Sequence, residues 1–368
     1  MNTAAHSEKR LYLAIECGSK EWKLAFGTGS GERETSIVAG DLAGLDRQIA
    51  RGKERLGLPA DAKVRSCYEA GRDGFWIHRM LTERGVENVV VDPASIEVKR
   101  RGKRVKTDRL DAKKLRAMLI RYWVYGETKS WSVVKVPTEN QEDARRAHRE
   151  RGRLSKERTA HRARIRSLLA LHGPVPRLLV SEGAQARDWK GRPLPPALIE
   201  EIDRELERLA RVEEQLGHLE EERRERYRTG TGRAAQQARQ LSRAKGVGEM
   251  TATLFAHEFF WRDFKNRREV GAAAGLVGCP YDSGQSRREQ GISKAGNRRI
   301  RTAMIELAWR WLTFQPDSEL SRWYERRFAH GSGRLRRIGI VALARKLLVA
   351  LWKFLEYDQI PAGAIVRP

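Results

Sequence analysis

Short apolar runs separated by glycine, proline and charged residues fill the first 130 residues. Residues 11–15 are all apolar and 22–26 alternate in part, so the two runs predict a β-hairpin. The same criteria predict further strands at 63–68 and 86–91, and helices at 46–56, at 70–81 and from 108 to about 123. Because strands alternate with helices, this part of the chain predicts an α/β domain.

The pattern changes at Pro137. Residues 139–172 are dense in Arg and Glu, and 197–227 keep apolar residues three or four positions apart. The two stretches predict an antiparallel helical hairpin or coiled coil. Their charged outer faces suit either a solvated surface or nucleic-acid contact, and the arginine excess of the first helix favours contact.

The last third of the chain predicts a mainly helical domain. Gly246-Val-Gly248 between two short helices resembles a helix-hairpin-helix element, whose backbone amides can hold a phosphate, although an ordinary tight turn explains it as well. A long tryptophan-bearing helix is predicted to follow the basic segment 291–301 and to run through Leu312, and a last amphipathic helix is predicted at 334–354. Four tryptophans in helical stretches are expected in the core: Trp309, Trp311, Trp323 and Trp352.

The charge of the chain points to a partner. It has 73 Lys and Arg against 48 Asp and Glu, a net charge of +25, and a pI near 10.4. Such an excess favours a nucleic acid, because binding releases condensed counterions. A membrane surface competes as a polyanion, but no stretch has the roughly 20 apolar residues of a spanning helix. Residues 1–10 also lack the apolar segment of a signal peptide.

Cysteine and histidine add little chemistry. Cys17, Cys67 and Cys279 are odd in number and far apart, which indicates reduced thiols in a cytoplasmic protein. No two histidines have the spacing of metal ligands. The chain also lacks the phosphate-binding loop of nucleotide hydrolases, so nothing supports an ATP-driven reaction.

Four acids carry the candidate chemistry. Asp108 and Asp111 are three residues apart and so share a helix face, whereas Glu16 and Glu69 end predicted strands. Two Mg²⁺ ions about 3.5–4 Å apart can bridge the attacking and leaving oxygens of a phosphodiester, and Mg²⁺ prefers carboxylate ligands. Helix capping or a surface position explains each acid singly, but their combined order favours the metal site. A basic run precedes the pair: Lys99, Arg100, Arg101, Lys103, Arg104 and Lys106.

These motifs resemble, in order, those of a known family. Tyr12-Leu-Ala-Ile-Glu16, Tyr68-Glu-Ala-Gly71, Lys106-Thr-Asp-Arg-Leu-Asp-Ala112, Asp282-Ser-Gly284 and Ile292-Ser-Lys-Ala-Gly-Asn297 are similar to the insertion-sequence-110 family of transposases. The resemblance covers nearly the whole chain and implies an Asp-Glu-Asp-Asp site on a ribonuclease-H/RuvC-like domain. The chain departs from the family at Glu16, where Asp is usual. Glu can still ligate Mg²⁺ but reaches one methylene further.

The resemblance also implies three domains and a nucleophile. A RuvC-like catalytic domain is expected at 8–130, a helical hairpin or coiled coil for dimerisation at 137–230, and a C-terminal transposase domain at 240–356. The nucleophile is assigned to Ser283, although the residue pattern alone favours a plain turn there, and Ser286 and Ser293 are fallback candidates. A serine hydroxyl can attack a phosphodiester and keep the bond energy in a phosphoserine link.

Cations close to Ser283 in sequence can offset negative charge on a phosphate under attack. They are Arg287, Arg288, Lys294, Arg298, Arg299 and Arg301. Gly291, Gly296 and Asn297 are expected to shape a turn that brings this segment to DNA.

The implied function is a DNA transposase that excises and inserts its own mobile element with Mg²⁺ as cofactor. The resemblance further implies a structured non-coding guide RNA that pairs with donor and target DNA. It implies dimers that pair into tetramers and a place in the bacterial cytoplasm with the nucleoid. Two alternatives stay open: a two-metal nuclease of the Holliday-junction type, in which water attacks, and a non-catalytic nucleic-acid-binding scaffold.

Overall fold

The computed structural model describes residues 10–96, 108–173, 187–283 and 286–367. For 108–110 and 282–289 it describes the helix or strand but not the side chains. The predicted basic run from Lys99 to Lys106 therefore lies outside the described residues. The chain divides into two compact units, Met1–Val136 and Pro137–Pro368.

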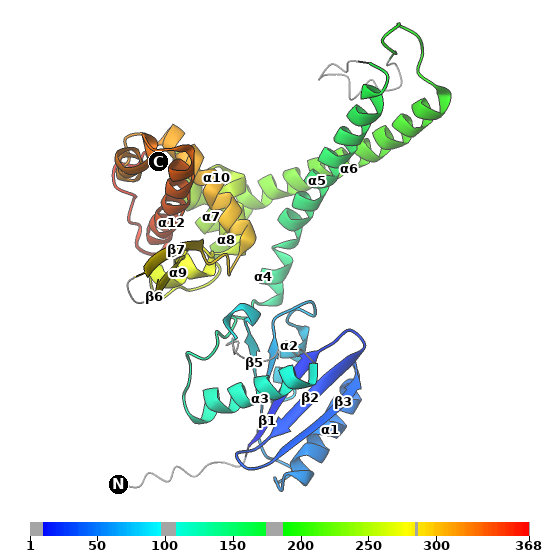
Figure 1. The fold of residues 1–368 in the computed structure, drawn as a ribbon, viewed down its shortest axis with the longest axis vertical. Helices are drawn as coiled ribbons and strands as arrows, with labels where there is room; N and C mark the ends of the chain where they lie inside the picture. The colour runs from blue at the N-terminus through cyan, green and yellow to red at the C-terminus, as the bar shows by residue number, and fades with distance from the viewer. Residues whose placement is uncertain (1–9, 97–107, 174–186, 284–285, 368) are drawn as a thin grey trace. The chain divides into compact units, whose positions relative to one another are not determined.

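A five-stranded sheet forms the centre of the first unit (Figure 1). Its strand order is β3-β2-β1-β4-β5. The β1–β2 and β2–β3 pairs are antiparallel, whereas β1–β4 and β4–β5 are parallel. The strands are β1 (Leu11–Cys17), β2 (Glu21–Gly27), β3 (Glu32–Val38), β4 (Val64–Glu69) and β5 (Glu87–Val91).

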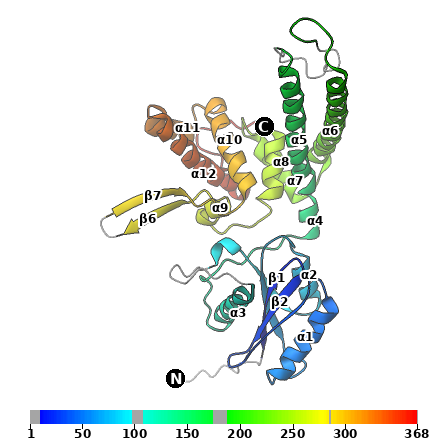
Figure 2. The ribbon, with the colours of Figure 1, turned by 45° about the vertical axis from the view of Figure 1, so that its right-hand side comes forward.

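Helices cover both faces of this sheet, as Figure 2 shows with the sheet close to edge-on. On one face α1 (Leu42–Arg55) and α2 (Trp76–Glu83) pack against the side of β1 that carries Leu13 and Ile15. On the other face α3 (Asp108–Val124) packs against Tyr12 and Ala14. The central strand β1 is thus covered on both sides, which explains why its apolar run is uninterrupted.

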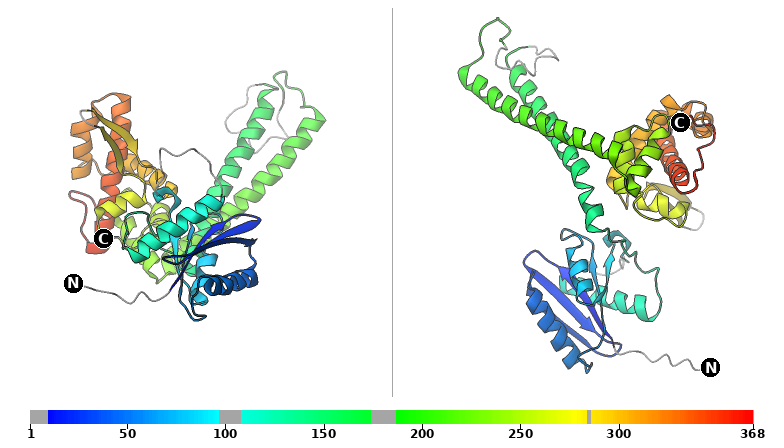
Figure 3. Two further views of the ribbon diagram at one scale, coloured as in Figure 1. Left: turned by 60° about the horizontal axis from the view of Figure 1, so that its bottom comes forward. Right: turned by 180° about the vertical axis from the view of Figure 1, so that it is seen from behind.

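The second unit begins with a helical hairpin (Figure 3). Thr138 forms a capping box at the start of α4 (Glu139–Asp143), and α5 (Arg146–Ala170) and α6 (Pro196–Thr229) follow. Helices α5 and α6 run antiparallel and share a core that includes Ile165 and Ile202.

The rest of the second unit is a cluster of helices with one β-hairpin. Its helices are α7 (Arg233–Arg243), α8 (Glu249–Glu258), α9 (Arg267–Ala273), α10 (Arg298–Phe314), α11 (Glu319–Tyr324), a π-helical turn (Glu325–Ala329) and α12 (Gly333–Tyr357). The hairpin strands are β6 (Gly278–Ser283) and β7 (Ser286–Ile292), and Figure 2 shows them extending away from the helices. Phe255, Trp311 and Leu347 are fully buried in the shared core.

These observations confirm a mixed α/β region followed by a mostly helical region. Two predicted element starts are wrong. The first helix begins at Leu42, four residues earlier than expected, because Asp41 caps it. The helix expected from Ala70 begins at Trp76 because a turn intervenes, in which Gly74 has a φ of 64°.

Strand β3 was not predicted, since its sequence Glu32–Val38 lacks an apolar alternation. It pairs with β2 along its whole length. A short 3₁₀ turn, Pro93–Ser95, follows β5. Within the described ranges, no helix is both long and apolar enough to span a lipid bilayer.

Candidate functional site

Glu16 and Glu69 lie at the carboxyl ends of two neighbouring parallel strands. The register of β1 and β4 pairs Ile15 with Tyr68, so each acid directly follows a paired residue. Ile15 and Tyr68 both belong to the core on the α1 and α2 side. Because side chains alternate along a strand, both acids are on the opposite face, which α3 covers.

The direction of α3 brings its first turn to the same end of the sheet. The Cys67 thiol donates to the Leu115 carbonyl at 3.8 Å, and the Arg65 guanidinium stacks over the Trp123 ring at 4.0 Å. The helix therefore runs antiparallel to β4. Moving back from Leu115 to Asp111 covers about 6 Å, and moving forward from Cys67 to Glu69 also covers about 6 Å.

Asp111 is therefore level with the two strand-end acids, on the side of the sheet that they share. Asp108 is the first residue of α3, and its side chain lies outside the described residues. Among residues with described side chains, no three His, Cys, Asp or Glu are grouped closely enough to hold a metal. Glu16, Glu69 and Asp111 are therefore at the same end of the sheet but are not gathered as metal ligands among the described side chains.

Ion pairs fix α3 over β2 and β3. Lys113 contacts Glu34 at 2.8 Å, and Arg116 forms an ion pair with Glu32. Arg116 also donates to the Phe26 carbonyl at 3.2 Å. These contacts hold the helix on the sheet and so set the position of its first turn.

The two cysteines beside the acids stay neutral. Burial raises the pKa of the Cys17 thiol to about 12, and the carboxylates of Asp73 and Glu16 add to the shift. Burial, reinforced by Glu69, also raises the pKa of Cys67 well above its usual value. The carboxylates of Glu16 and Glu69 are the hard oxygen donors at this end of the sheet.

Ser283 is the last residue of β6. It pairs with Ser286, the first residue of β7, so both serines flank the tip of the hairpin. The side chains of these serines, and those of Arg287 and Arg288, lie outside the described residues. Ser283 is therefore at a strand end, and its role as a nucleophile stays a prediction.

The turn after this hairpin is clamped against the end of α9. The Lys294 amide donates to the Gly275 carbonyl at 3.2 Å, and the Asn297 amide donates to the Ala273 carbonyl at 2.8 Å. Gly296 has a φ of 112°, and a Cβ there would meet the Ala273 oxygen at 2.4 Å. Only glycine fits this approach.

Asn297 and Arg301 hold this turn in place. The Asn297 side chain caps α10 by accepting from the Arg299 amide at 3.0 Å, and it donates to the Glu258 carbonyl at 3.3 Å. Arg301 donates to the Lys294 carbonyl at 3.0 Å. Both side chains thus have a positioning role, whereas Lys294 and Arg298 are exposed to solvent.

The Gly246-Val-Gly248 turn lies between α7 and α8. Gly246 has a φ of 94° and packs against the Phe314 side chain, and Val247 is buried. Gln315 donates to the Lys245 carbonyl at 2.9 Å, which ties the turn to the end of α10. Gly248 is exposed at the start of α8, so phosphate binding by its amides remains a prediction.

Much of the charge on the α5–α6 hairpin is paired within the hairpin. Arg162 contacts Glu213 at 2.5 Å, and Arg164 contacts Glu205 at 2.5 Å. The carboxylate of Glu205, which is 4% exposed, also accepts from His161 at 2.6 Å. Because these guanidinium groups have carboxylate partners, they add little to an attraction for phosphates.

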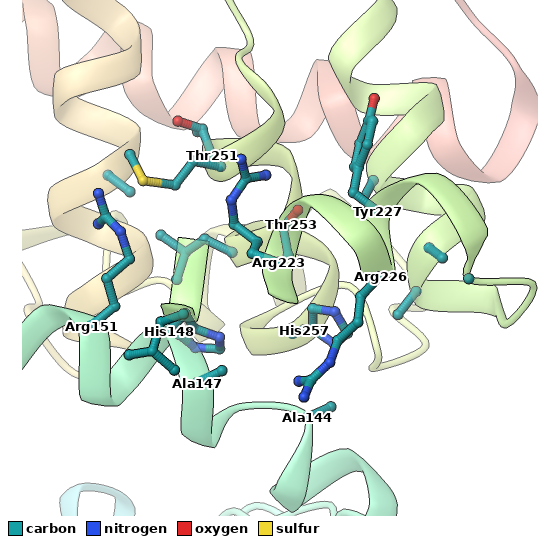
Figure 4. A pocket seen from close by; sticks show the side chains of 18 of the residues that line it. Ala144, Ala147, His148, Arg151, Arg223, Arg226, Tyr227, Thr251, Thr253 and His257 are labelled. Atoms are coloured by element: carbon teal, nitrogen blue, oxygen red, sulfur yellow. The ribbon is translucent and has the colours of Figure 1, made fainter. Parts of the chain in front are cut away.

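A cavity of about 530 Å³ lies where the start of α5 and the end of α6 meet α7, α8 and α10 (Figure 4). Burial lowers the pKa of His257 in its wall to about 4, so this imidazole is neutral at pH 7. Arg151 contacts Glu220 at 3.7 Å, and Arg223 contacts Glu220 at 2.7 Å and Glu249 at 3.5 Å. Each of these two arginines thus has a carboxylate partner, and the cavity lies at a junction between helices.

One tryptophan prediction is wrong. Trp311 and Trp352 are buried and Trp323 is partly buried, but the Trp309 side chain is 47% exposed. Trp309 shares the outer face of α10 with Glu306 and Thr313, which also face solvent. The helix buries one stripe only, and Trp309 is outside it.

A basic surface on α12 was not predicted. Arg337, Lys346 and Lys353 are exposed on this helix, which was predicted only as an amphipathic element. The cations of α12 are visible in the sequence, but their spacings of three, eight, one and seven residues do not follow a single helix face, so the sequence pattern alone does not indicate this surface.

Known proteins are similar to the chain over most of its length. A model described as "Transposase IS116/IS110/IS902 family" matches residues 238–324, which include the β6–β7 hairpin. The chain is 38% identical over 377 residues to "Putative transposase y4rJ" of Sinorhizobium fredii (strain NBRC 101917 / NGR234), covering 97% of this chain and 94% of the relative. It is 26% identical over 200 residues to "Transposase for insertion sequence element IS1328" of Yersinia enterocolitica, covering 54% of each. The chain therefore belongs to the IS116/IS110/IS902 family of transposases.

Proposed function

We propose that this transposase cuts and rejoins the DNA of its insertion sequence with four carboxylates and one serine. The supporting observation is the register of β1 and β4, which pairs Ile15 with Tyr68. Glu16 and Glu69 directly follow these two residues and are therefore both on the opposite face of the sheet, which α3 covers. An acid on the first strand, another on a later strand and a pair on a helix is the plan of ribonuclease-H-type sites. We therefore also propose a RuvC-like fold for the first unit.

The chemistry of the donor set fits Mg²⁺, because carboxylate oxygens are its preferred protein ligands. Glu16, Glu69, Asp108 and Asp111 would hold it. When bound, Mg²⁺ supplies positive charge that stabilises the negative charge of a phosphate under attack.

Ser283 is the proposed nucleophile. Its hydroxyl oxygen forms a bond to phosphorus and loses its proton, while the bond from phosphorus to one deoxyribose oxygen breaks and that oxygen leaves as a hydroxyl. The phosphoserine link keeps the energy of the broken bond. A hydroxyl from a new DNA end then attacks the same phosphorus and regenerates the serine, so no external energy source is needed.

Cations after the hairpin support this step. Lys294 and Arg298 are exposed next to the clamped turn, and their charges can offset negative charge on the phosphate. Asn297 and Arg301 act through the turn that they hold and are positioning residues.

The finer features that the family resemblance implies belong to the same proposal. They are guidance by a structured non-coding RNA, a coiled coil between α5 and α6 that serves dimerisation, assembly of dimers into tetramers, and action on nucleoid DNA in the bacterial cytoplasm. Within one chain, α5 and α6 pack antiparallel through a shared apolar core, which supports the helical-hairpin part of this proposal.

The serine is tested with a plasmid that carries the ends of the element and a denaturing gel that retains covalent protein–DNA adducts. We expect Ser283→Ala to abolish the adduct and strand exchange. Ser286→Ala is the matched control, since it lies opposite in the hairpin register, and it should keep both. An adduct that survives in Ser283→Ala and vanishes in Ser286→Ala assigns the nucleophile to Ser286 instead.

The same assay separates the alternative functions. Undiminished cleavage without an adduct in both serine variants would favour a two-metal nuclease that uses water. Binding of DNA without Mg²⁺-dependent cleavage under any condition would favour a scaffold. For the acids, Asp111→Asn should abolish cleavage, whereas Asp46→Asn, a surface acid that pairs with Arg84 at 3.3 Å, should not.

A further inference from the structure

A groove of about 1040 Å³ runs along α12, between α9, α11 and the base of the β6–β7 hairpin. One wall continues from the end of β7 through Gln290 and Ile292. The groove therefore begins where the strand of the proposed nucleophile hairpin ends. All of α12 lies beyond residue 324, where the family match stops.

The walls of this groove carry positive charge alone. Eight of the lining residues are Lys or Arg, and none of those described is acidic. Five cations come from α12: Arg334, Arg337, Arg345, Lys346 and Lys353. The other three are Arg267 and Arg268 of α9 and Lys294 of the clamped turn.

The cations of the groove differ from arginines of α6 in their carboxylate partners. In the part of the chain that the structure describes, none of the eight has a carboxylate partner. On α6, Arg211 contacts Glu214 and Arg228 contacts Glu225, both at 2.5 Å. Uncompensated like charges repel one another, so eight of them gathered in one groove indicate an anionic occupant.

The part of the groove that α12 lines has the length of an extended polyanion. Its cations span residues 334 to 353, and at 1.5 Å per residue they follow about 28 Å of helix. A small anion would engage two or three cations and leave the others unpaired. A chain of phosphates matches the whole row.

The floor of the groove is apolar. Ile338 is 52% exposed, and Val341, Val349 and Leu276 also line the surface. Trp323 lies at one side with the Lys346 ammonium 4.7 Å from its ring centre. A regular duplex presents phosphates and sugars on its outside and would leave this floor uncovered, whereas the bases of a single strand can lie on it.

We propose that this groove holds a single strand of DNA, with phosphates on the cations of α12 and α9 and bases on the apolar floor. The choice of DNA rests on the proposed function, because the groove continues from the hairpin whose serine would attack DNA. The strand would then reach the base of the hairpin, at Gly278 and Ile292.

Binding of fluorescein-labelled 20-mers by the full-length protein tests this proposal. The probes are dT20, an abasic deoxyribose-phosphate 20-mer, a 20-base-pair duplex and U20 RNA. The groove variant replaces Arg337, Lys346 and Lys353 with Ala. Its matched control replaces Arg326, Arg327 and Arg336 with Ala, which removes the same charge from exposed positions outside the groove.

For dT20 we expect the groove variant to lower the slope of log affinity against log salt by about 2, since each phosphate contact contributes roughly 0.7. Its Kd at 0.2 M salt should rise on the order of 30-fold. Ile338→Ser should weaken the binding of dT20 by about fivefold and leave the binding of the abasic strand unchanged. The far-ultraviolet circular dichroism of each variant checks that it is folded.

Equal effects of the groove and control variants would overturn the proposal. A loss for the duplex as large as that for dT20 would overturn its single-strand part, and a larger loss for U20 than for dT20 would overturn the choice of DNA. The test is separate from the serine test. Loss of dT20 binding in the groove variant would stand even if Ser283→Ala still formed adducts, and the serine mechanism would stand if binding were unchanged.

Discussion

Arg149 donates two hydrogen bonds to Glu258, from Nε to Oε1 at 2.6 Å and from Nη2 to Oε2 at 2.9 Å. His148 contacts the same carboxylate at 2.8 Å. Burial alone would raise the pKa of Glu258, but these hydrogen bonds outweigh it and hold the pKa well below its usual range. Because Arg149 is on α5 and Glu258 on α8, the pair joins the helical hairpin to the helical cluster.

Replacing Arg149 with Ala should therefore destabilise the second unit. The buried Glu258 carboxylate, 2% exposed, would lose its two strongest hydrogen bonds, and we expect a cost of about 2–3 kcal/mol. Arg146→Ala is the control, because its contact with Asp143 is on the surface and should cost less than about 0.5 kcal/mol. Urea unfolding measures both, and equal costs would contradict the assigned role of the pair.

Acid should destabilise the same region through His257. Its folded pKa of about 4 is below the ordinary value of 6.5, so the unfolded state binds more protons between these values. Stability is then complete above pH 6.5 and is lost as the pH falls toward 4. We expect wild type to lose about 2 kcal/mol more than His257→Gln between pH 7 and pH 4.5.

Unfolding free energies at the two pH values measure this difference. His218→Gln, at an exposed position of α6, should keep the wild-type dependence. Glu258 contributes in a separate pH range. Because its pKa is lowered in the folded protein, the stability that its carboxylate contributes is lost only when the pH falls below the ordinary pKa of a carboxyl group. An unchanged pH dependence in His257→Gln would rule out the buried neutral imidazole.

Gly296→Ala should be more harmful than Gly291→Ala. Both glycines have positive φ, at 112° and 86°, but only the Cβ at Gly296 would clash, 2.4 Å from the Ala273 oxygen. We expect Gly291→Ala to lower the free energy of unfolding by about 1 kcal/mol through backbone strain, and Gly296→Ala to lower it by more than about 3 kcal/mol. Thermal unfolding compares them, and equal losses would show that the turn relaxes freely.

The departure at Glu16 gives a fourth prediction, which rests on the proposed metal site. Glu16→Asp keeps the carboxylate and should retain Mg²⁺-dependent cleavage, whereas Glu16→Gln should lose more than the roughly 100-fold that follows loss of a ligand's hydrogen-bond partner. Glu54→Gln, exposed on α1, is the control. Plasmid cleavage over a Mg²⁺ titration gives the result, and an active Glu16→Gln would remove Glu16 from the acid set.

Local patterns predicted most of the fold because burial follows them directly. The apolar run at β1 and the three-four spacing on α6 each correspond to a buried stripe. Strand β3 escaped prediction because its place at the sheet edge is set by pairing with β2, which leaves no alternation in its own sequence. Trp309 escaped because composition around a residue does not tell which face of a helix it occupies.

The four acids remain a prediction, which the sequence allows because they lie near the ends of predicted strands or in the first turn of a predicted helix. Their common face could not be predicted, since it depends on the register of β1 with β4 and on the direction of α3. The α12 groove depends in the same way on α9 and the hairpin base, which are distant in sequence.

The acid-bearing unit is continuous in sequence, Met1–Val136, and this has a consequence for synthesis. Asp111 leaves the ribosome 172 residues before Ser283. At a synthesis rate of roughly 5–20 residues per second, the first unit has on the order of ten to thirty seconds to fold before Ser283 is added to the chain. During synthesis the unit that carries the four proposed acids is therefore made before the proposed nucleophile, Ser283.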